Sequence, residues 1–261
     1  MLKRLSIIPL LFIGLFFMLS NSCKKDHNGS DPVKVIDPIL KIDMVFVQGG
    51  TFQMGSNYTQ DFDSPIHTVT LSDFYMGKCE VTQAQWAAIM DENYSYFRGD
   101  NQPVESISWN EIQEFLILLN SRTGKKYRLP TDAEWEYAAR GGIKSKGFIF
   151  SGSNTLTDVA WYETNSGITH AVGTKLSNEL GLYDMTGNVY EWCNDWYDRF
   201  STNAQTNPTG PSTGVVRINR GGGWSSDPSN SRILRRNFNY PGDRNLGLGF
   251  RLSYSIPLSI L

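Results

Sequence analysis

The sequence has few of the residues and patterns on which several classes of protein depend. Only 3 of its 261 residues are Cys, too few for a disulfide-linked scaffold. Lys and Arg number 24 against 26 Asp and Glu, and a net charge of −2 without a long basic run excludes a nucleic-acid-binding protein. Neither an internal repeat nor a low-complexity linker divides residues 42–255, so a single domain is expected there.

Long apolar runs are also missing, and the longest one lies near the N-terminus. It covers residues 5–19 after two basic residues, which is shorter than the roughly 20 residues of a membrane-spanning helix. We therefore interpret residues 1–22 as a signal peptide. Small residues lead up to Cys23, and the segment resembles the lipoprotein signals of Bacteroidetes-like bacteria. An alternative is ordinary secretion with an incidental cysteine.

The lipoprotein resemblance implies a lipid on the thiol of Cys23 and a flexible tether over residues 23–41. It also implies anchoring to the cell envelope at the outer membrane, on its periplasmic or its surface face. Two further cysteines, Cys79 and Cys193, would then remain as free thiols or as one disulfide, which an exported compartment permits. Sequence alone does not give the distance between their Cα atoms, so both alternatives stay open.

Three short helices are predicted by capping boxes, in which a Ser or Thr caps backbone N–H groups and a Glu or Gln three residues later reaches back. Apolar residues recur at helical spacing after each box, so one face of each helix is expected in the core. Gly124 and Gly141-Gly142 are expected to end the second and third helices. The capping pairs are Thr82 with Gln85, Ser108 with Glu111, and Thr131 with Glu134.

Short strands are expected around these helices. Residues 45–47 and 52–54 flank a Gly-Gly segment and predict a β-hairpin, and residues 69–71 and 74–76 predict two more strands. Over residues 145–254 helical periodicity disappears, while Gly, Asn, Trp and Tyr are frequent. Such a segment becomes ordered only if buried aromatic rings or a bound metal offset the entropy of its turns.

Six motifs occur in a fixed order along the chain. They are residues 46–55 (FVQGGTFQMG), 80–82 (EVT), 127–141 (YRLPTDAEWEYAARG), 181–192 (GLYDMTGNVYEW), 220–224 (RGGGW) and 249–252 (GFRL). Together they resemble the formylglycine-generating enzyme family, also called sulfatase-modifying factors. The resemblance implies an α+β fold over residues 42–261 with a C-type-lectin-like core, in which short helices flank a twisted antiparallel sheet and much structure is irregular. Active members oxidise a cysteine in a Cys-x-Pro-x-Arg segment of a sulfatase to formylglycine, using oxygen and a copper(I) ion held by two cysteines.

The two copper-binding cysteines of the family are absent from their expected positions. The family pattern places them just after the fifth motif, where this chain has Ser226 and Ser231. Copper(I) prefers thiolate sulfur to hydroxyl oxygen, so copper is not expected here. A serine nucleophile would need an adjacent base and an orienting acid, and His67 and His170 lie in no supporting signature.

A calcium site is implied by the fourth motif. In the family pattern, Asp184 and Glu191 would donate side-chain oxygens and Gly187 and Val189 would donate backbone carbonyls, which are the ligands that calcium prefers. The alternative is that both acids cap turns or pair with arginine. A second family site would draw on the loop around Asn165, but the sequence assigns no ligands to it.

Charged residues near the altered cysteine positions suggest a groove. Its candidate residues are Trp224, Ser226, Ser231 and Arg232. The cluster of Arg232, Arg235 and Arg236 either lines a groove for an anionic ligand or forms a solvated edge. Buried ion pairs with Glu134, Glu136 or Asp195 are expected for the motif arginines Arg128, Arg140, Arg220 and Arg251.

The sequence therefore predicts an exported, lipid-anchored member of the family without its copper-thiolate chemistry. Its expected role is that of a calcium-stabilised binding or structural domain for a protein or peptide partner, as in gliding-motility lipoproteins that carry such domains. The alternative is a formylglycine-generating oxidase with an unrecognised metal site. Whether the protein is an enzyme stays open, because function is carried by the site and not by the fold.

Overall fold

Residues 35–36, 40–57 and 62–255 are described by the computed structural model. All of them fall within a unit of residues 32–261. The predicted signal peptide and Cys23 lie outside the described residues. Among the described helices, none is long and apolar enough to cross a membrane.

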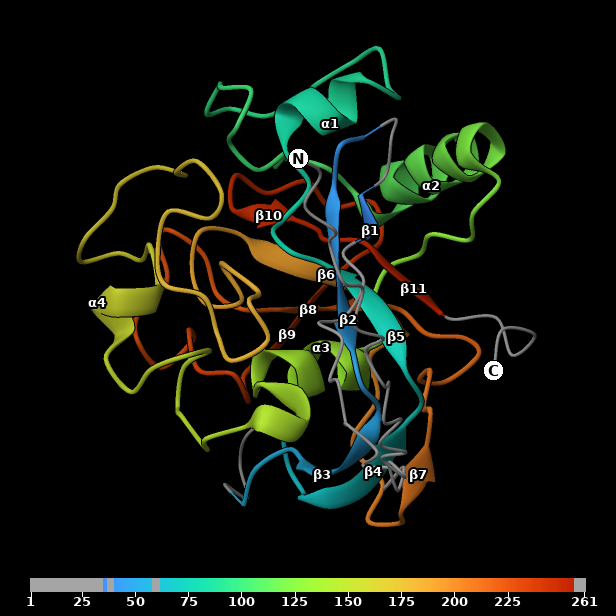
Figure 1. The fold of residues 1–261 in the computed structure, drawn as a ribbon, viewed down its shortest axis with the longest axis vertical. Helices are drawn as coiled ribbons and strands as arrows, with labels where there is room; N and C mark the ends of the chain where they lie inside the picture. The colour runs from blue at the N-terminus through green and yellow to red at the C-terminus, as the bar shows by residue number, and fades with distance from the viewer. Residues whose placement is uncertain (1–34, 37–39, 58–61, 256–261) are drawn as a thin grey trace, which may run out of the picture. The chain divides into compact units, whose positions relative to one another are not determined.

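The strands form three small sheets (Figure 1). Their strand orders are β1-β2-β5-β11, β10-β6-β8-β9 and β3-β4-β7. The strand pairs are antiparallel, except for the parallel pairs β10–β6 and β4–β7. The strand bounds are β1 Val35–Ile36, β2 Asp43–Val47, β3 Gly50–Met54, β4 His67–Leu71, β5 Phe74–Gly77, β6 Tyr190–Trp196, β7 Gln205–Thr206, β8 Arg217–Arg220, β9 Arg236–Asn239, β10 Leu248–Gly249 and β11 Ser253–Ser255.

The predicted hairpin of residues 45–47 and 52–54 is wrong, although both segments are strands. β2 pairs with β5, whereas β3 pairs with β4 in another sheet. The chain changes sheet at Gly49, where a Cβ would lie 2.3 Å from the carbonyl oxygen of Leu71. The N–H group of Gly49 is bound by Asp73 Oδ1 at 2.7 Å. Because the backbone at Gly49 packs directly against that at Leu71, the chain leaves the sheet of β2 there and continues as β3 in the sheet of β4.

All three predicted capping boxes are present, with both reciprocal hydrogen bonds in each. Gly124 adopts a left-handed conformation (φ 69°) after the second helix, and Gly141 (φ 93°) follows the third. The helix bounds are α1 Gln83–Ala87, α2 Trp109–Thr123, α3 Asp132–Ala139, the 3-10 helix η1 Gly142–Lys144 and α4 Leu156–Val159.

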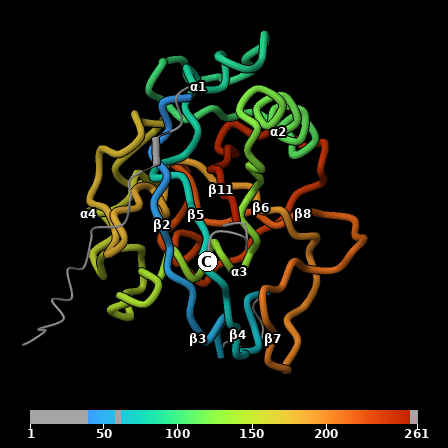
Figure 2. The backbone as a smooth tube through the Cα atoms, turned by 45° about the vertical axis from the view of Figure 1, so that its right-hand side comes forward, coloured from blue at the N-terminus to red at the C-terminus, as the bar shows by residue number. Residues whose placement is uncertain are grey.

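Helix α3 is the central helix of the fold, because all of its residues are buried. It contacts β3 and β4 in one sheet and β6 and β8 in another. Helices α1 and α2 lie at the opposite end from β3, β4 and β7 (Figures 1 and 2). There the rings of Trp86 and Phe115 stack at 5.1 Å and Phe250 packs against both edge-on. Two apolar cores result, one around α2 and one around α3.

Ion pairs at and around α3 confirm most of the expected arginine contacts. Arg128 pairs with Glu134 at 2.6 Å, and Arg140 pairs with Glu136 at 2.7 Å. Arg220 also reaches Glu136, at 2.8 Å. Two of the acids that pair with arginine, Asp132 and Glu191, are not among the partners that the sequence predicts. Arg220 and Arg236 bind Asp132, at 2.5 and 3.0 Å, and Arg251 binds Glu191 at 2.6 Å.

Candidate functional site

Ser226 and Ser231, the residues at the family's cysteine positions, lie in the loop between β8 and β9. Both are buried. The hydroxyl of Ser226 accepts a hydrogen bond from Gly223 N at 2.9 Å and donates one to the phenolic oxygen of Tyr190 at 3.1 Å. The hydroxyl of Ser231 donates to the carbonyl of Asp227 at 3.2 Å. Both hydroxyls therefore hold the loop in place, and this oxygen pair does not fit copper(I).

The serines also lack the partners of a hydrolytic nucleophile. The ring of His170 contacts Ser166 at 2.9 Å, and the Nδ1 atom of His67 contacts the carbonyl of Pro65 at 3.3 Å. Neither contact places a histidine on Ser226 or Ser231. Burial raises the pKa of Tyr190, the phenol beside Ser226, so it is not a base at neutral pH either. A serine triad is not assembled in the described part of the chain.

A cavity of about 400 Å³ opens beside the Ser226 loop. Tyr190 at the start of β6, Asn219 on β8 and Asn237 and Asn239 on β9 line it, together with Trp224. Asn219 lies opposite Asn237 in the β8–β9 register, so their side chains project from the same face of the sheet. The opposite face carries Glu191, Ile218 and Arg220, which point into the core around α3. We call this cavity the asparagine pocket.

The residues of the predicted groove lie at different distances from this pocket. Trp224 lines the asparagine pocket. Ser226 does not line it, but its hydroxyl is hydrogen-bonded to Tyr190, which does. Ser231 and Arg232 are not among the residues that line it. Our sequence reasoning missed the asparagines, although they alternate with core residues along β8 and β9. That period of two is the signal that would have placed them on one face.

Glu191, one of the predicted calcium ligands, is engaged by other side chains of the protein. Both carboxylate oxygens of Glu191 bind Arg251 at 2.6 Å, and one also accepts a hydrogen bond from the Trp135 ring at 2.7 Å. Asp184 Oδ2 instead accepts the N–H group of Gly173 at 2.6 Å. The arrangement of Glu191 is the arginine pairing that the sequence left as the alternative.

A third buried acid, Glu80, lies close to this cluster. Its carboxyl lies within hydrogen-bond reach of the Asp184 carboxyl, and its oxygens have no other partner among the described residues. Burial, and then repulsion from Asp184 and Glu191, raises the pKa of Glu80, while burial raises the pKa of Asp184 to about 6. Three buried carboxyls face one buried guanidinium, that of Arg251, which leaves an excess of acid for protons or a cation to neutralise.

Of the three acids, only Glu191 has both carboxylate oxygens bound by the Arg251 guanidinium. A cavity of about 320 Å³ beside the cluster is lined in part by Glu80, Gly173 and Lys78, while the carboxylate oxygens of Glu80 are themselves buried. The described residues contain no group of three or more His, Cys, Asp or Glu side chains arranged to hold a metal. A calcium ion here would therefore take its remaining ligands from backbone carbonyls, such as those of Gly187 and Val189, and from water.

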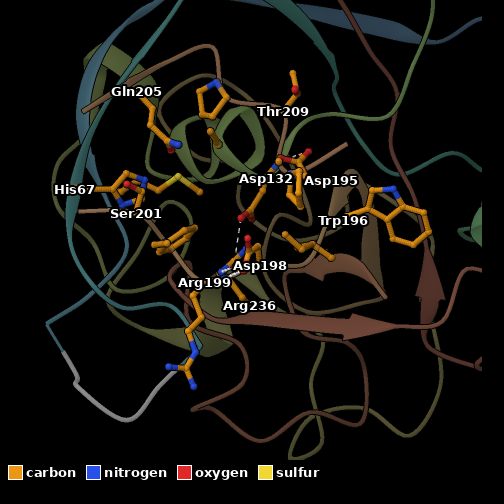
Figure 3. A pocket seen from close by; sticks show the side chains of 17 residues that line it. His67, Asp132, Asp195, Trp196, Asp198, Arg199, Ser201, Gln205, Thr209 and Arg236 are labelled. Carbon is orange, nitrogen blue, oxygen red and sulfur yellow. Dashed lines mark hydrogen bonds and ion pairs between the residues drawn. The ribbon is translucent and has the colours of Figure 1, made fainter. Parts of the chain in front are cut away.

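A cavity of about 330 Å³ next to β4, β6 and β9 contains several charged residues (Figure 3). Arg236 faces Asp132 there, at 3.0 Å, and packs 4.0 Å from the ring of Phe200. Burial, and then the nearby Asp132, raises the pKa of Asp195. Arg236 is therefore neither a solvated edge nor a cation available to an anionic ligand, because its charge is already neutralised.

Cys79 and Cys193 are free thiols and do not form a disulfide. Cys193 is buried in the core around α3, and burial raises its pKa. Burial, and then the nearby Asp184, raises the pKa of Cys79 to about 12. Neither thiol lies in the Ser226 loop, so neither replaces a copper-binding cysteine of the family.

Comparison with curated proteins finds relatives of several kinds. The chain is 37% identical to the chaperone protein LppX of Paenibacillus barcinonensis, over 79% of this chain and 86% of the relative. It is 31% identical to the serine/threonine-protein kinase pkn1 of Chlamydia caviae over 83% of this chain, but spans only 38% of that protein. It is 27% identical to the formylglycine-generating enzyme of Streptomyces coelicolor, over 82% of this chain and 90% of the enzyme.

Solved structures share the fold. Treponema denticola variable protein 1 matches with a TM-score of 0.80 and 32% identity, covering 85% of this chain and 99% of that one. PvdO from Pseudomonas aeruginosa matches with a TM-score of 0.74 and 25% identity, covering 87% and 99%. These matches confirm the predicted α+β fold of the formylglycine-generating-enzyme type with its C-type-lectin-like core. The model of the sulfatase-modifying factor enzyme 1-like domain matches residues 38–256. The chain therefore belongs to the family of proteins that contain this domain.

Proposed function

We propose that this chain is an exported, lipid-anchored family member that has lost the copper-thiolate oxidase chemistry and acts as a binding or structural domain. The proposal rests on the hydrogen bonds that Ser226 and Ser231 make at the family's cysteine positions. Their hydroxyls are bonded to Gly223, Tyr190 and Asp227 within their own loop. A copper thiolate would supply both oxygen activation and the contact with the substrate thiol, so losing both sulfurs abolishes the reaction.

The names of the relatives are compatible with a role other than oxidation. The relative with 37% identity is named a chaperone protein, and a solved structure with 32% identity is named a variable protein. Neither name describes an oxidase. A protein or peptide partner in the cell envelope, including a gliding-motility complex, is the partner class that we propose.

The alternative function is a formylglycine-generating oxidase. Its support is the similarity to enzymes of that name, at 27% identity over most of their length. Such an enzyme would need to activate oxygen without the two cysteines. The described residues around Ser226 offer no second pair of sulfur ligands, since Cys79 and Cys193 lie elsewhere in the fold.

Calcium is part of the proposal as a stabilising ion. We expect Asp184 and Glu80, with backbone carbonyls of Gly187 and Val189, to hold it, because these acids carry buried charge that Arg251 alone does not neutralise. When bound, calcium supplies positive charge and ties the loop after Asp184 to the strand end at Glu80.

The oxidase question is tested with the purified chain, copper(I), oxygen and a Cys-x-Pro-x-Arg peptide. We expect no aldehyde by mass spectrometry above a sample without protein. The enzyme of Streptomyces coelicolor serves as the positive control, and the double variant Ser226→Cys/Ser231→Cys restores the sulfur pair. Aldehyde formed by the unaltered chain would overturn the proposal, whereas aldehyde formed only by the double variant would confirm that the serines are what removed the activity.

A further inference from the structure

The asparagine pocket differs from the other cavities in its charge. None of the described residues that line it is Asp, Glu, Lys, Arg or His, whereas the cavity of Figure 3 is lined by Asp132, Asp195, Asp198, Arg199 and Arg236. An ionic ligand would find no opposite charge in the asparagine pocket. Its lining favours a neutral ligand that is recognised by hydrogen bonds and aromatic contact.

The floor of the pocket contains an acceptor without a donor. Asn219 is fully buried, and its Oδ1 atom has no hydrogen-bond partner within the described residues. Buried amide oxygens are normally paired, so this atom marks a position where a ligand or an ordered water donates.

Neighbouring side chains fix which atom of Asn219 faces the ligand. The carboxylate of Asp243 can only accept, so it holds the Nδ2 group of Asn239, at 3.3 Å. Asn239 therefore presents its Oδ1 atom to Asn219 and accepts the Nδ2 group of that residue at 2.9 Å. The orientation of both amides follows from this series of hydrogen bonds, and the Asn219 atom that is left without a partner is its acceptor oxygen, Oδ1. A ligand must bring an O–H or N–H group, which ionised sulfate and carboxylate groups and fully ionised phosphate groups do not offer.

Aromatic rings continue from the pocket to the surface. The ring of Phe97 packs edge-on against Trp224 at 5.3 Å, and Tyr96 packs against Phe97 at 5.1 Å. Tyr96 is 68% exposed, and Leu246 at the rim is 44% exposed. Such rings offer apolar faces to the C–H side of a sugar, while amide side chains, which both donate and accept, match its neighbouring hydroxyls.

The position of the pocket on the sheet argues against an extended peptide. Peptides that add to a sheet pair with the main chain of an edge strand. The asparagine pocket lies over the face of the β10-β6-β8-β9 sheet, so a ligand there meets amide and aromatic side chains rather than the free main-chain groups of the edge strands β9 and β10. We propose that the asparagine pocket binds a neutral saccharide, with Asn219 Oδ1 accepting from a sugar hydroxyl and Trp224 contacting the ring. This inference rests on the proposed function, since it makes the altered groove a binding site.

The test is calorimetric titration of the full chain with neutral trisaccharides, namely mannotriose, cellotriose and triacetylchitotriose. A sulfated heparin tetrasaccharide and an uncharged Gly-Ser peptide serve as competing probes. We expect one or more neutral trisaccharides to bind, with the dissociation constant unchanged in chelator because no carboxylate lines the pocket. Binding of only the heparin or only the peptide would overturn the inference, as would binding of none of the probes.

Variants locate the site. We expect Asn219→Ala and Trp224→Ala each to raise the dissociation constant about tenfold, while the exposed Asn203→Ala and the surface Trp161→Ala leave it unchanged. Trp224 is partly exposed, so its variant remains informative if the buried Asn219→Ala fails to fold. Saccharide binding that survives Trp224→Ala would overturn the site assignment. The same preparations are assayed for aldehyde: aldehyde overturns the proposed function, whereas missing saccharide binding without aldehyde overturns the saccharide inference alone.

Discussion

Replacing Asp184 by Asn should stabilise the metal-free protein at neutral pH. The carboxyl of Asp184 is buried and faces Glu80, Glu191 and Arg251, so its negative charge is poorly compensated. Asn has nearly the same shape and tolerates the left-handed backbone of this position (φ 56°). It also keeps an oxygen that can accept from Gly173 N, as Asp184 Oδ2 does at 2.6 Å. The substitution therefore removes charge while leaving packing and the loop hydrogen bond in place.

The magnitude follows from the pKa of Asp184, which burial raises from 3.8 to about 6. This change corresponds to a penalty of about 3 kcal/mol on the ionised form, at about 1.4 kcal/mol for each tenfold change in acid dissociation. Because the raised pKa belongs to the folded state, the folded protein binds more protons than the unfolded chain between about pH 4 and pH 6. The contribution of Asp184 to stability therefore falls as the pH rises through that window.

The assay is urea unfolding of wild type and Asp184→Asn in chelator at several pH values. We expect the two free energies of unfolding to coincide near pH 4 and the variant to be more stable by up to about 3 kcal/mol at pH 7. The exposed Asp100→Asn is the control and should change neither value. In calcium the order should reverse, since the ion neutralises wild type and loses a ligand in the variant. A variant that is less stable than wild type in chelator at pH 7 would refute the reasoning.

Three further outcomes are expected. Arg220→Met should lower the free energy of unfolding by about 3 kcal/mol in urea titration, because two buried carboxylates each lose one of their two arginine partners; the exposed Arg199→Met should have no such effect. Cys23→Ser should abolish incorporation of labelled palmitate and release the protein from the membrane fraction, and retention of both would exclude the lipid anchor. Cys79, whose pKa is raised to about 12, and the buried Cys193 should resist a thiol reagent at pH 8 until urea is added, and rapid labelling of the native protein would contradict the raised pKa of these thiols.

Local signals predicted local structure well. The capping boxes at Thr82, Ser108 and Thr131 begin helices as expected, because each involves residues only three positions apart. The pairing of β2 and β3 failed for the opposite reason. Their strand pattern is correct, but the partner of each strand is set by the contact of Gly49 with residues 71–73, which no local pattern contains.

The candidate site divides in the same way. The change from cysteine to serine at positions 226 and 231 is visible in the sequence, and the structure adds that both hydroxyls are engaged. The pairing of Glu191 with Arg251 and the approach of Glu80 to Asp184 depend on residues 60 and more than 100 positions from Glu191. Spacing within one motif could not distinguish this arrangement from a calcium site built on Glu191.

The first sheet constrains how the chain acquires its structure during synthesis. β11 pairs with β5, and β5 pairs with β2, so strands separated by about two hundred residues complete one sheet. Arg251 lies just before β11 in the sequence, and its guanidinium binds Glu191 in the acid cluster. A ribosome-bound or partly translocated chain that has not yet emerged through residue 255 lacks both elements. Folding is therefore expected only after nearly the whole domain is free, with slow kinetics typical of such distant pairing.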